Sequence, residues 1–359
     1  MFHKNLLAGL AAGLLLCVQT GLALAAVPKD APKDIKHILG FYYGNGENIL
    51  IRENNGELEL LYRFAYEDKD FSGSNIFPLK KMHFDSYSII EAGPMNRSEA
   101  TVKFERDADG YGIACRVGGH TYSRHYFGVG TGERPEAFRF PELTSEKWTE
   151  LKQDAAKAVM PAALGAGSAV QLVNASSIVG LKVNSVYAGS NNCFGAPLYS
   201  TNSLYIGKNA ALALEKVQQR LSEQGYGLVL WDAYRPWSIS KLAYLALPEK
   251  SKDMLENPDL KGSIHNTGNA VDVGLYDLAT GAEIELTSGF DEPSIRQYAS
   301  YAGGTSRQRY LRGLLRDTME LYGFKGIEME WWHYEFGDAS QNAHLNICLL
   351  YTSDAADEL

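Results

Sequence analysis

The segment Ser263-Ile-His265-Asn-Thr-Gly268-Asn-Ala270-Val-Asp272 determines how the second half of this chain folds. Gly268 permits a tight turn directly after His265. The apolar run that follows, Ala270–Leu275, indicates a strand that carries Asp272. We therefore expect the chain to turn back and present Asp272 to the same point as His265. The Asn-Thr-Gly-Asn run also fits an ordinary surface loop, so this segment alone leaves the metal-site and loop interpretations open.

A second segment, Glu330-Trp331-Trp332-His333, lies about sixty residues further on. Residues three apart share a face of a helix, but on a flat strand they point to opposite sides. The two tryptophans favour extended structure, so we expect an irregular or bulged strand. A Trp-rich core segment with two polar outliers is the alternative. Taken together, His265, Asp272 and His333 form a two-histidine, one-carboxylate set for one zinc ion, with Glu330 as a base beside it.

A third segment, Trp231-Asp232-Ala-Tyr-Arg235-Pro236, follows a short apolar run at 228–231 that predicts a buried strand. The strand and Pro236 would hold the stem of Arg235 in a fixed place. A fixed guanidinium is well suited to stabilising an oxyanion. The alternative is a structural ion pair between Arg235 and Asp232.

Length and composition set wide limits. At 359 residues the chain is long enough for two ordinary domains, and an apolar content of 45% is enough to form hydrophobic cores. The net charge of -9 argues against nucleic acid as a main partner, because phosphate binding favours a basic face.

The first residues resemble a secretory signal, which we assign to residues 1–26. Lys4 supplies a positive start, an apolar run covers residues 6–18, and Ala23-Leu24-Ala25 supplies a small-residue cleavage site. A membrane anchor is the alternative, but the run is short for a bilayer span. We therefore expect a periplasmic or secreted protein with no membrane span after cleavage.

Cysteine usage gives no disulfide framework. Cys17 leaves with the signal, and Cys348 lies near the C-terminus. We expect the other two, Cys115 and Cys193, to be small buried hydrophobic residues.

Residues 27–142 have the pattern of a small all-β barrel or sandwich. Strand-like runs flank Asn54-Asn55-Gly56 and Asp107–Gly110, which are hairpin signals. The pattern resembles the lipocalin-like accessory domains of some bacterial hydrolases. We expect structural or surface roles for the four histidines of this region, His37, His83, His120 and His125, because their spacing gives no convincing metal site.

The remaining chain divides into three parts. Residues 143–168 indicate a helix ended by Pro161 and a small-residue linker. Residues 169–347 follow an α+β pattern, with an amphipathic helix expected at 209–224 and a second long helix at 307–321. Residues 348–359 resemble a translated sequencing adapter, and a genuine acidic tail is the alternative. We expect this part to be a non-native or disordered tail that packs poorly.

The three motifs resemble those of the VanX-type D-alanyl-D-alanine dipeptidases, which are zinc peptidases. Asn191-Asn192-Cys193-Phe194-Gly195 and Gly289-Phe290-Asp291-Glu292 are similar to two further family segments, although Cys193 interrupts the first. All motifs occur in the family's order between residues 178 and 336. The resemblance implies an α+β zinc peptidase domain in which a central antiparallel sheet carries flanking helices. The β domain lies outside it.

The resemblance also implies roles for single residues. The zinc ligands would be His265, Asp272 and His333. Glu330 would act as general base and acid and Arg235 would stabilise the oxyanion, while Ser263 and Asp291 would bind a small dipeptide, Asp291 through the free amine. The implied reaction is hydrolysis of D-alanyl-D-alanine by a metal-activated water.

Other functions remain open from the sequence. A D,D-carboxypeptidase or peptidoglycan endopeptidase of the same clan would act on peptidoglycan fragments. Those families usually have Pro-Trp-His after the glutamate, so Trp331-Trp332 favours the dipeptidase. A catalytically inactive zinc-binding cell-wall module is a second alternative, against which the presence of Glu330 and Arg235 argues.

Overall fold

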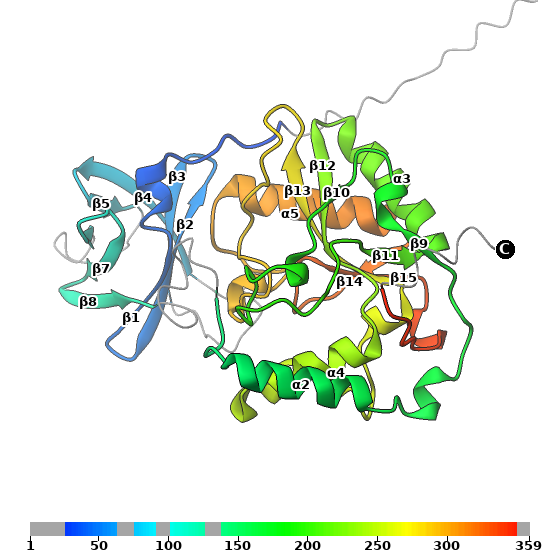
Figure 1. The fold of residues 1–359 in the computed structure, drawn as a ribbon. Helices are drawn as coiled ribbons and strands as arrows, with labels where there is room; N and C mark the ends of the chain where they lie inside the picture. The colour runs from blue at the N-terminus through cyan, green and yellow to red at the C-terminus, as the bar shows by residue number, and fades with distance from the viewer. Residues whose placement is uncertain (1–25, 63–74, 91–100, 126–137, 350–359) are drawn as a thin grey trace, which may run out of the picture.

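The computed structural model describes residues 26–62, 75–90, 101–125 and 138–349, which form an all-β part followed by an α+β part (Figure 1). The expected signal peptide, up to residue 25, and residues 350–359 lie outside the described residues. Among the residues described, no helix combines the length and apolar character needed to cross a membrane.

The first part is a closed antiparallel barrel, which confirms the expected β domain. Each strand pairs with the next, and β1 pairs with β8 to close the barrel. Its strands are β1 (Gly40–Gly44), β2 (Glu47–Asn54), β3 (Glu57–Tyr62), β4 (Asn75–His83), β5 (Ser86–Ile89), β6 (Thr101–Arg106), β7 (Gly112–Val117) and β8 (His120–Arg124).

Both predicted hairpins are present. Asn55 and Gly56 have φ of 51° and 92° between β2 and β3, the left-handed pair that a two-residue hairpin turn needs. Gly110 has φ of 85° between β6 and β7. Turn residues therefore set the register that places alternate side chains of the strands in the barrel core.

One helix lies on each side of the barrel in the sequence. α1 (Lys33–Lys36) leads into the barrel, and α2 (Ser145–Lys157) follows it. Thr144 caps α2 by accepting a hydrogen bond from the Lys147 amide, and Leu151 and Ala155 are buried on one face. This is the helix predicted before Pro161.

The second part is built on a five-stranded sheet in the order β10-β12-β13-β15-β14. Strand β10 is parallel to β12 and the other pairs are antiparallel, so the expected antiparallel sheet has one parallel edge strand. The five strands are β10 (Lys182–Val183), β12 (Tyr226–Asp232), β13 (Ala270–Asp277), β14 (Phe324–Gly326) and β15 (His333–Phe336). A separate pair consists of β9 (Leu172–Asn174) and β11 (Tyr205–Gly207).

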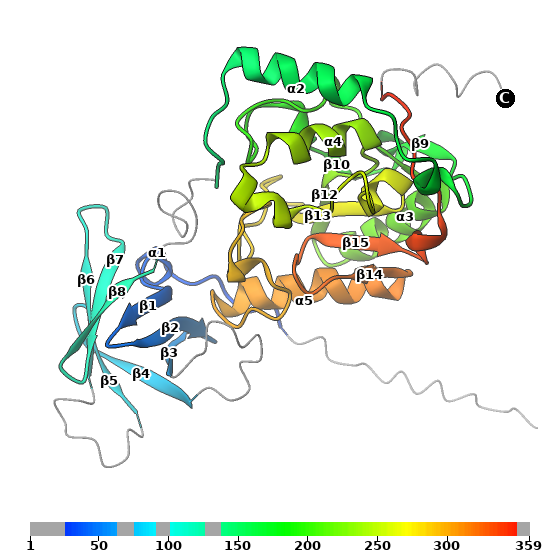
Figure 2. The ribbon, with the colours of Figure 1, turned by 90° about the horizontal axis from the view of Figure 1, so that it is seen from below.

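Helices cover both faces of this sheet (Figure 2). α2 and α4 (Trp237–Ala246) lie on one side, and α3 (Lys208–Ser222) and α5 (Ser306–Leu321) lie on the other. The sequence predicted α3 from its apolar stripe and α5 as a second long helix before Gly323. It did not predict α4, which begins directly after Pro236. Proline fixes a backbone angle compatible with a helix start, so the motif that holds Arg235 also starts a helix.

Local structure differs from the expectation at Glu330–Trp332. These residues form a turn, closed by a 3.2 Å hydrogen bond from the His333 amide to the Glu330 carbonyl, and the strand begins only at His333. The irregular or bulged strand expected here is therefore a strand only from His333 onward, although the Trp332 carbonyl still accepts from the Val273 amide of β13 at 3.0 Å. The two tryptophans pack as a corner against neighbouring aromatic rings.

Cys115 and Cys193 are buried free thiols, as predicted. The expectation of poor packing after Ile347 is wrong at Leu349, whose side chain is 6% exposed and belongs to the main apolar core. Cys348 beside it is exposed.

Candidate metal centre

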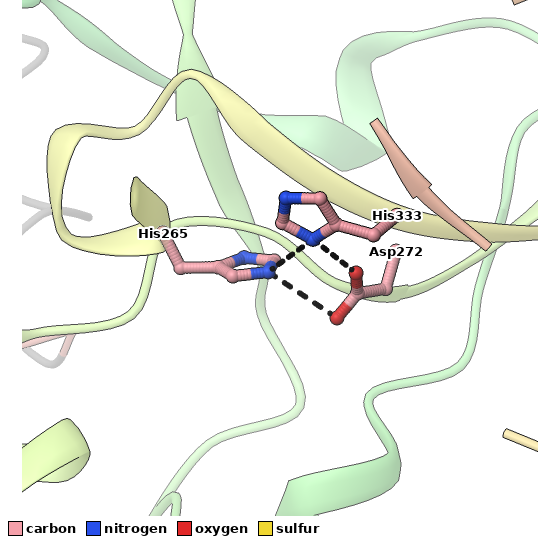
Figure 3. Close-up of side chains that lie close together, drawn as sticks. All are labelled: His265, Asp272 and His333. Atoms are coloured by element: carbon pink, nitrogen blue, oxygen red, sulfur yellow. Dashed lines mark hydrogen bonds and ion pairs between the residues drawn. The ribbon is translucent and has the colours of Figure 1, made fainter. Parts of the chain in front are cut away.

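Three side chains meet at one point of the sheet, as Figure 3 shows. Asp272 Oδ1 lies 3.0 Å from His333 Nδ1, and Asp272 Oδ2 lies 3.3 Å from His265 Nε2. The two ring nitrogens, His265 Nε2 and His333 Nδ1, are 3.2 Å apart. All three residues are buried. In the described part of the chain, no other group of three histidine, cysteine or acidic side chains gathers in this way.

Strand register brings two of the three ligand candidates together. Asp272 on β13 lies opposite His333 on β15, and on its other side it lies opposite Asp232 on β12. The β12–β13 ladder shifts register between Leu230 and Asp232. Three strands therefore place Asp232, Asp272 and His333 in one row across the sheet.

A short 3-10 turn, Ile264–Thr267, positions His265. The Ser263 hydroxyl accepts from the His265 amide, and Gly268 ends the turn with φ of 81°. A Cβ at Gly268 would lie 2.6 Å from the Leu172 side chain, so this position requires glycine. The ring then donates from Nδ1 to the Ala233 carbonyl at 2.7 Å, which directs Nε2 into the site.

The donor set fits a zinc ion. Ligand atoms around a tetrahedral zinc with bonds of about 2.0–2.1 Å lie about 3.3 Å apart. The separations of 3.0, 3.2 and 3.3 Å join four candidate atoms, the two ring nitrogens and the two oxygens of Asp272, and they are close to that spacing. Two imidazoles and a carboxylate also match the ligands of catalytic zinc sites, which keep a further position for water.

The electrostatics of the three residues favour a cation. Burial opposes the charged form of Asp272, but the two histidines beside it bring its pKa below the usual range. Burial likewise lowers the pKa of His333, yet the hydrogen bonds to Asp272 and Glu335 raise it to about 10. Without a metal the cluster would therefore hold a proton, and metal binding would release it.

Arg235 is fixed by the carboxylate of Asp232. Its Nε and Nη2 lie 3.0 and 2.6 Å from Asp232 Oδ2, and the Tyr199 hydroxyl donates to Oδ1 at 2.6 Å. The guanidinium also lies 5.3 Å from the centre of the Tyr187 ring. The ion pair that the sequence offered as an alternative is thus present. It fixes the Arg235 guanidinium at the edge of the group of candidate metal ligands.

Asp291 occupies a left-handed backbone conformation, with φ of 57°. Its Oδ2 accepts from the Tyr187 hydroxyl at 2.6 Å and lies 3.5 Å from the Cys193 sulfur. Burial, with added repulsion from Asp272 and Glu330, raises the pKa of Asp291 to about 7. Burial also raises the pKa of Glu330 above its usual value.

A single cleft of about 540 Å³ brings the predicted site residues together. It is lined by all seven residues that the sequence singled out: Arg235, Ser263, His265, Asp272, Asp291, Glu330 and His333. These residues come from segments that span about a hundred positions of the chain.

Comparison with known proteins agrees with this geometry. The peptidase family described as D-ala-D-ala dipeptidase matches residues 168–349. The chain belongs to this family. It is 35% identical to a D-alanyl-D-alanine dipeptidase of Enterococcus faecalis, a match that covers 44% of this chain and 87% of the relative. For the D-alanyl-D-alanine dipeptidase of Escherichia coli the identity is 32%, over 45% and 81% of the two chains.

The protein is therefore a peptidase with an added domain. The family match begins at residue 168, so the barrel lies outside it. A solved LD-carboxypeptidase aligns with 42% of this chain and 65% of its own at 22% identity, but its TM-score of 0.26 is too low to support an argument.

Sequence reasoning missed the residues that support this dipeptidase-family site. Tyr187 and Tyr199 belong to no motif, and only the fold brings their hydroxyls to Asp291 and Asp232. Asn266 belongs to the predicted loop but was given no role. Its side-chain amide donates to the Arg235 carbonyl and to the Ser240 hydroxyl, both at 2.8 Å. Its position directly after His265 in the motif was the one available signal, since a polar side chain that becomes buried there needs partners.

Proposed function

We propose that this protein hydrolyses the D-alanyl-D-alanine dipeptide with one zinc ion per chain. The observation that carries the proposal is the single cleft that holds a two-histidine, one-carboxylate cluster together with Glu330, Arg235 and Asp291. Membership of the family supports the same reaction.

In this proposal His265, Asp272 and His333 hold the metal. When bound, zinc would polarise the peptide carbonyl and lower the pKa of a water molecule beside it. Glu330 takes the proton of the attacking water and then donates it to the leaving amine. Its raised pKa suits this double role, because a catalytic acid and base works best with a pKa near the working pH.

Arg235 stabilises the negative charge that develops on the carbonyl oxygen. Asp232 holds the guanidinium before the substrate arrives, so no reorganisation is needed during the reaction. Ser263 and Asp291 bind the dipeptide, with Asp291 as the partner of its free ammonium group. A carboxylate that pairs with a free ammonium group favours a substrate whose first residue lies next to Asp291. A dipeptide meets this condition, because its first residue directly precedes the bond that is cleaved.

We also propose the setting of the activity. Residues 1–26 direct the chain to the periplasm or outside the cell, 27–142 form the accessory domain, 143–168 the connection and 169–347 the catalytic domain. In that compartment the enzyme would encounter cell-wall dipeptides and, as further substrates, peptidoglycan fragments.

A substrate panel tests the proposal. Purified protein is incubated with D-Ala-D-Ala, L-Ala-L-Ala, N-acetyl-D-Ala-D-Ala and a pentapeptide ending in D-Ala-D-Ala, and released D-alanine or L-alanine is measured. Preference for free D-Ala-D-Ala supports the dipeptidase. Equal or better cleavage of the acylated and longer peptides would replace it with a carboxypeptidase, and cleavage of none would overturn it.

A further inference from the structure

The barrel contacts the peptidase part through the outer face of β1, β2 and β3. Along these strands Ile49, Ile51 and Leu60 belong to the barrel core, whereas Leu50 and Leu61 belong to a separate cluster. That cluster joins Phe41, Leu50 and Leu61 of the barrel to Ile295, Tyr298 and Tyr301 of the peptidase part. Tyr301 is 1% exposed, so the contact is dry at its centre.

A buried carboxylate strengthens this contact. Glu53, 3% exposed at the end of β2, accepts from the Ser306 amide at 2.6 Å, at the first residue of α5. The backbone of Glu53 also donates to the Gly304 carbonyl at 3.1 Å and accepts from Arg309 at 2.8 Å. A carboxylate is stabilised at a helix N-terminus, because the free amides and the helix dipole favour negative charge. The barrel thus supplies an acid to a helix of the other domain.

The segment that the barrel holds is bonded to the loop that carries Glu330. The Trp331 amide donates to the Gln297 carbonyl at 2.9 Å, and the Ala299 amide donates to the Glu328 carbonyl at 2.9 Å. These bonds lie on either side of Glu330 in the chain. Glu330 itself sits in a turn outside any strand, so its position depends on such contacts.

The same segment continues back to Asp291. Arg296 donates to both carboxylate oxygens of Glu292, at 2.7 and 2.6 Å, directly beside Asp291. Near the C-terminal end of the segment, Arg312 of α5 donates a hydrogen bond to the Tyr301 carbonyl at 2.8 Å. Residues 291–306 are therefore held at one end by the cleft and at the other by the barrel and α5. In Figure 1 the loop before α5 lies beside β2 and β3.

We propose that the barrel is a positioning element for the peptidase reaction, and that Glu53 is its main positioning residue. By fixing residues 295–306 it holds the Glu330 turn at the distance that proton transfer requires. The inference rests on the proposed function, in which Glu330 is the base. The metal ligands need no such support, because β13, β15 and the turn at Ile264–Thr267 hold them.

Point variants test this better than removal of the barrel, which would expose the apolar contact. Glu53→Ala should retain one equivalent of zinc and lose about tenfold in kcat for D-Ala-D-Ala, with a smaller change in KM, since small misplacement of a catalytic group has costs of this order or more. Glu53→Gln, which keeps an acceptor for the Ser306 amide, should retain kcat within about threefold. Glu57→Ala, at an exposed position of the same hairpin, is the matched control and should behave as wild type.

Hydrogen exchange supplies a readout that needs no substrate. In Glu53→Ala the amides of Ala299 and Trp331 should exchange faster than in wild type and in Glu57→Ala. Leu61→Ala, which thins the apolar contact and leaves Glu53 in place, should show the same two effects, so that one variant that fails to fold does not end the test. Wild-type kcat and exchange in the folded variants, with only a lower Tm, would overturn the inference and leave the barrel a stabilising role. Absence of all D-Ala-D-Ala hydrolysis by the wild-type protein would instead overturn the proposed function.

Discussion

Asp272 and His333 lie directly opposite each other on neighbouring antiparallel strands, and their side chains meet with Oδ1 3.0 Å from Nδ1. Backbone hydrogen bonds of the β13–β15 ladder therefore fix the spacing of two candidate metal ligands. The third, His265, is held by its own bond to the Ala233 carbonyl. A site built on sheet backbone keeps its geometry when single neighbouring side chains change.

The first prediction concerns the metal. Purified protein should contain about one equivalent of zinc, and Asp272→Ala should contain almost none, because it removes the carboxylate that both histidines face. Metal analysis after dialysis measures this. His120→Ala on the barrel, where the histidine is exposed, should retain the metal, and full zinc in Asp272→Ala would refute the ligand assignment.

A second prediction separates Glu330 from the ligands. Glu330→Gln should bind zinc normally and lose on the order of 10²–10⁴ in kcat, since the amide cannot accept the proton of water. Metal content and steady-state kinetics on the same preparation distinguish the two effects. Near-normal turnover in this variant would mean that another group acts as the base.

Local sequence rules predicted much of this fold, and the reasons differ between elements. Asn55 and Gly56 predicted their hairpin because a two-residue turn needs positive φ at both positions. The ends of β12 and β13 were near their predicted places because apolar runs mark buried strands. The side-by-side register of Asp232 with Asp272 was not predictable, since it depends on a register shift in the β12–β13 ladder.

The contact between the barrel and the peptidase part could not be predicted from the sequence. Leu61 broke the alternation of β3, where Glu57 and Glu59 occupy the same outer face. Leu61 is apolar because it packs against a surface more than two hundred residues away in the chain, at Tyr298 and Tyr301. Long-range contacts of this kind are not contained in a local pattern.

The third prediction concerns stability at the arginine. Asp232 is fully buried and neutralises Arg235, so Asp232→Ala leaves a buried cation without its partner. We expect the free energy of unfolding to fall by about 3–5 kcal/mol. Asp259→Ala, which removes a half-exposed partner of Lys241, is the control and should cost less than about 1 kcal/mol. Denaturant titration measures the free energy of unfolding of both variants. Equal losses would show that the buried ion pair contributes no more to stability than the half-exposed pair.

The last prediction is a pH dependence that originates at Asp291. Its pKa is raised to about 7, so at lower pH this carboxyl is protonated and cannot pair with the substrate's ammonium group. For free D-Ala-D-Ala, kcat/KM should therefore rise as pH increases through about 7. The effect on stability has the opposite sign. The folded state binds this proton more tightly than the unfolded state, so the contribution of Asp291 to stability falls between its ordinary pKa of 3.8 and about 7. N-acetyl-D-Ala-D-Ala has no ammonium group, and Glu330 titrates with either substrate, so the difference between the two pH profiles below about pH 7 reports Asp291. Above that pH the substrate's own ammonium group, with an ordinary pKa of about 8, also loses its proton. In Asp291→Asn that difference should disappear, and its persistence would show that another group binds the amine.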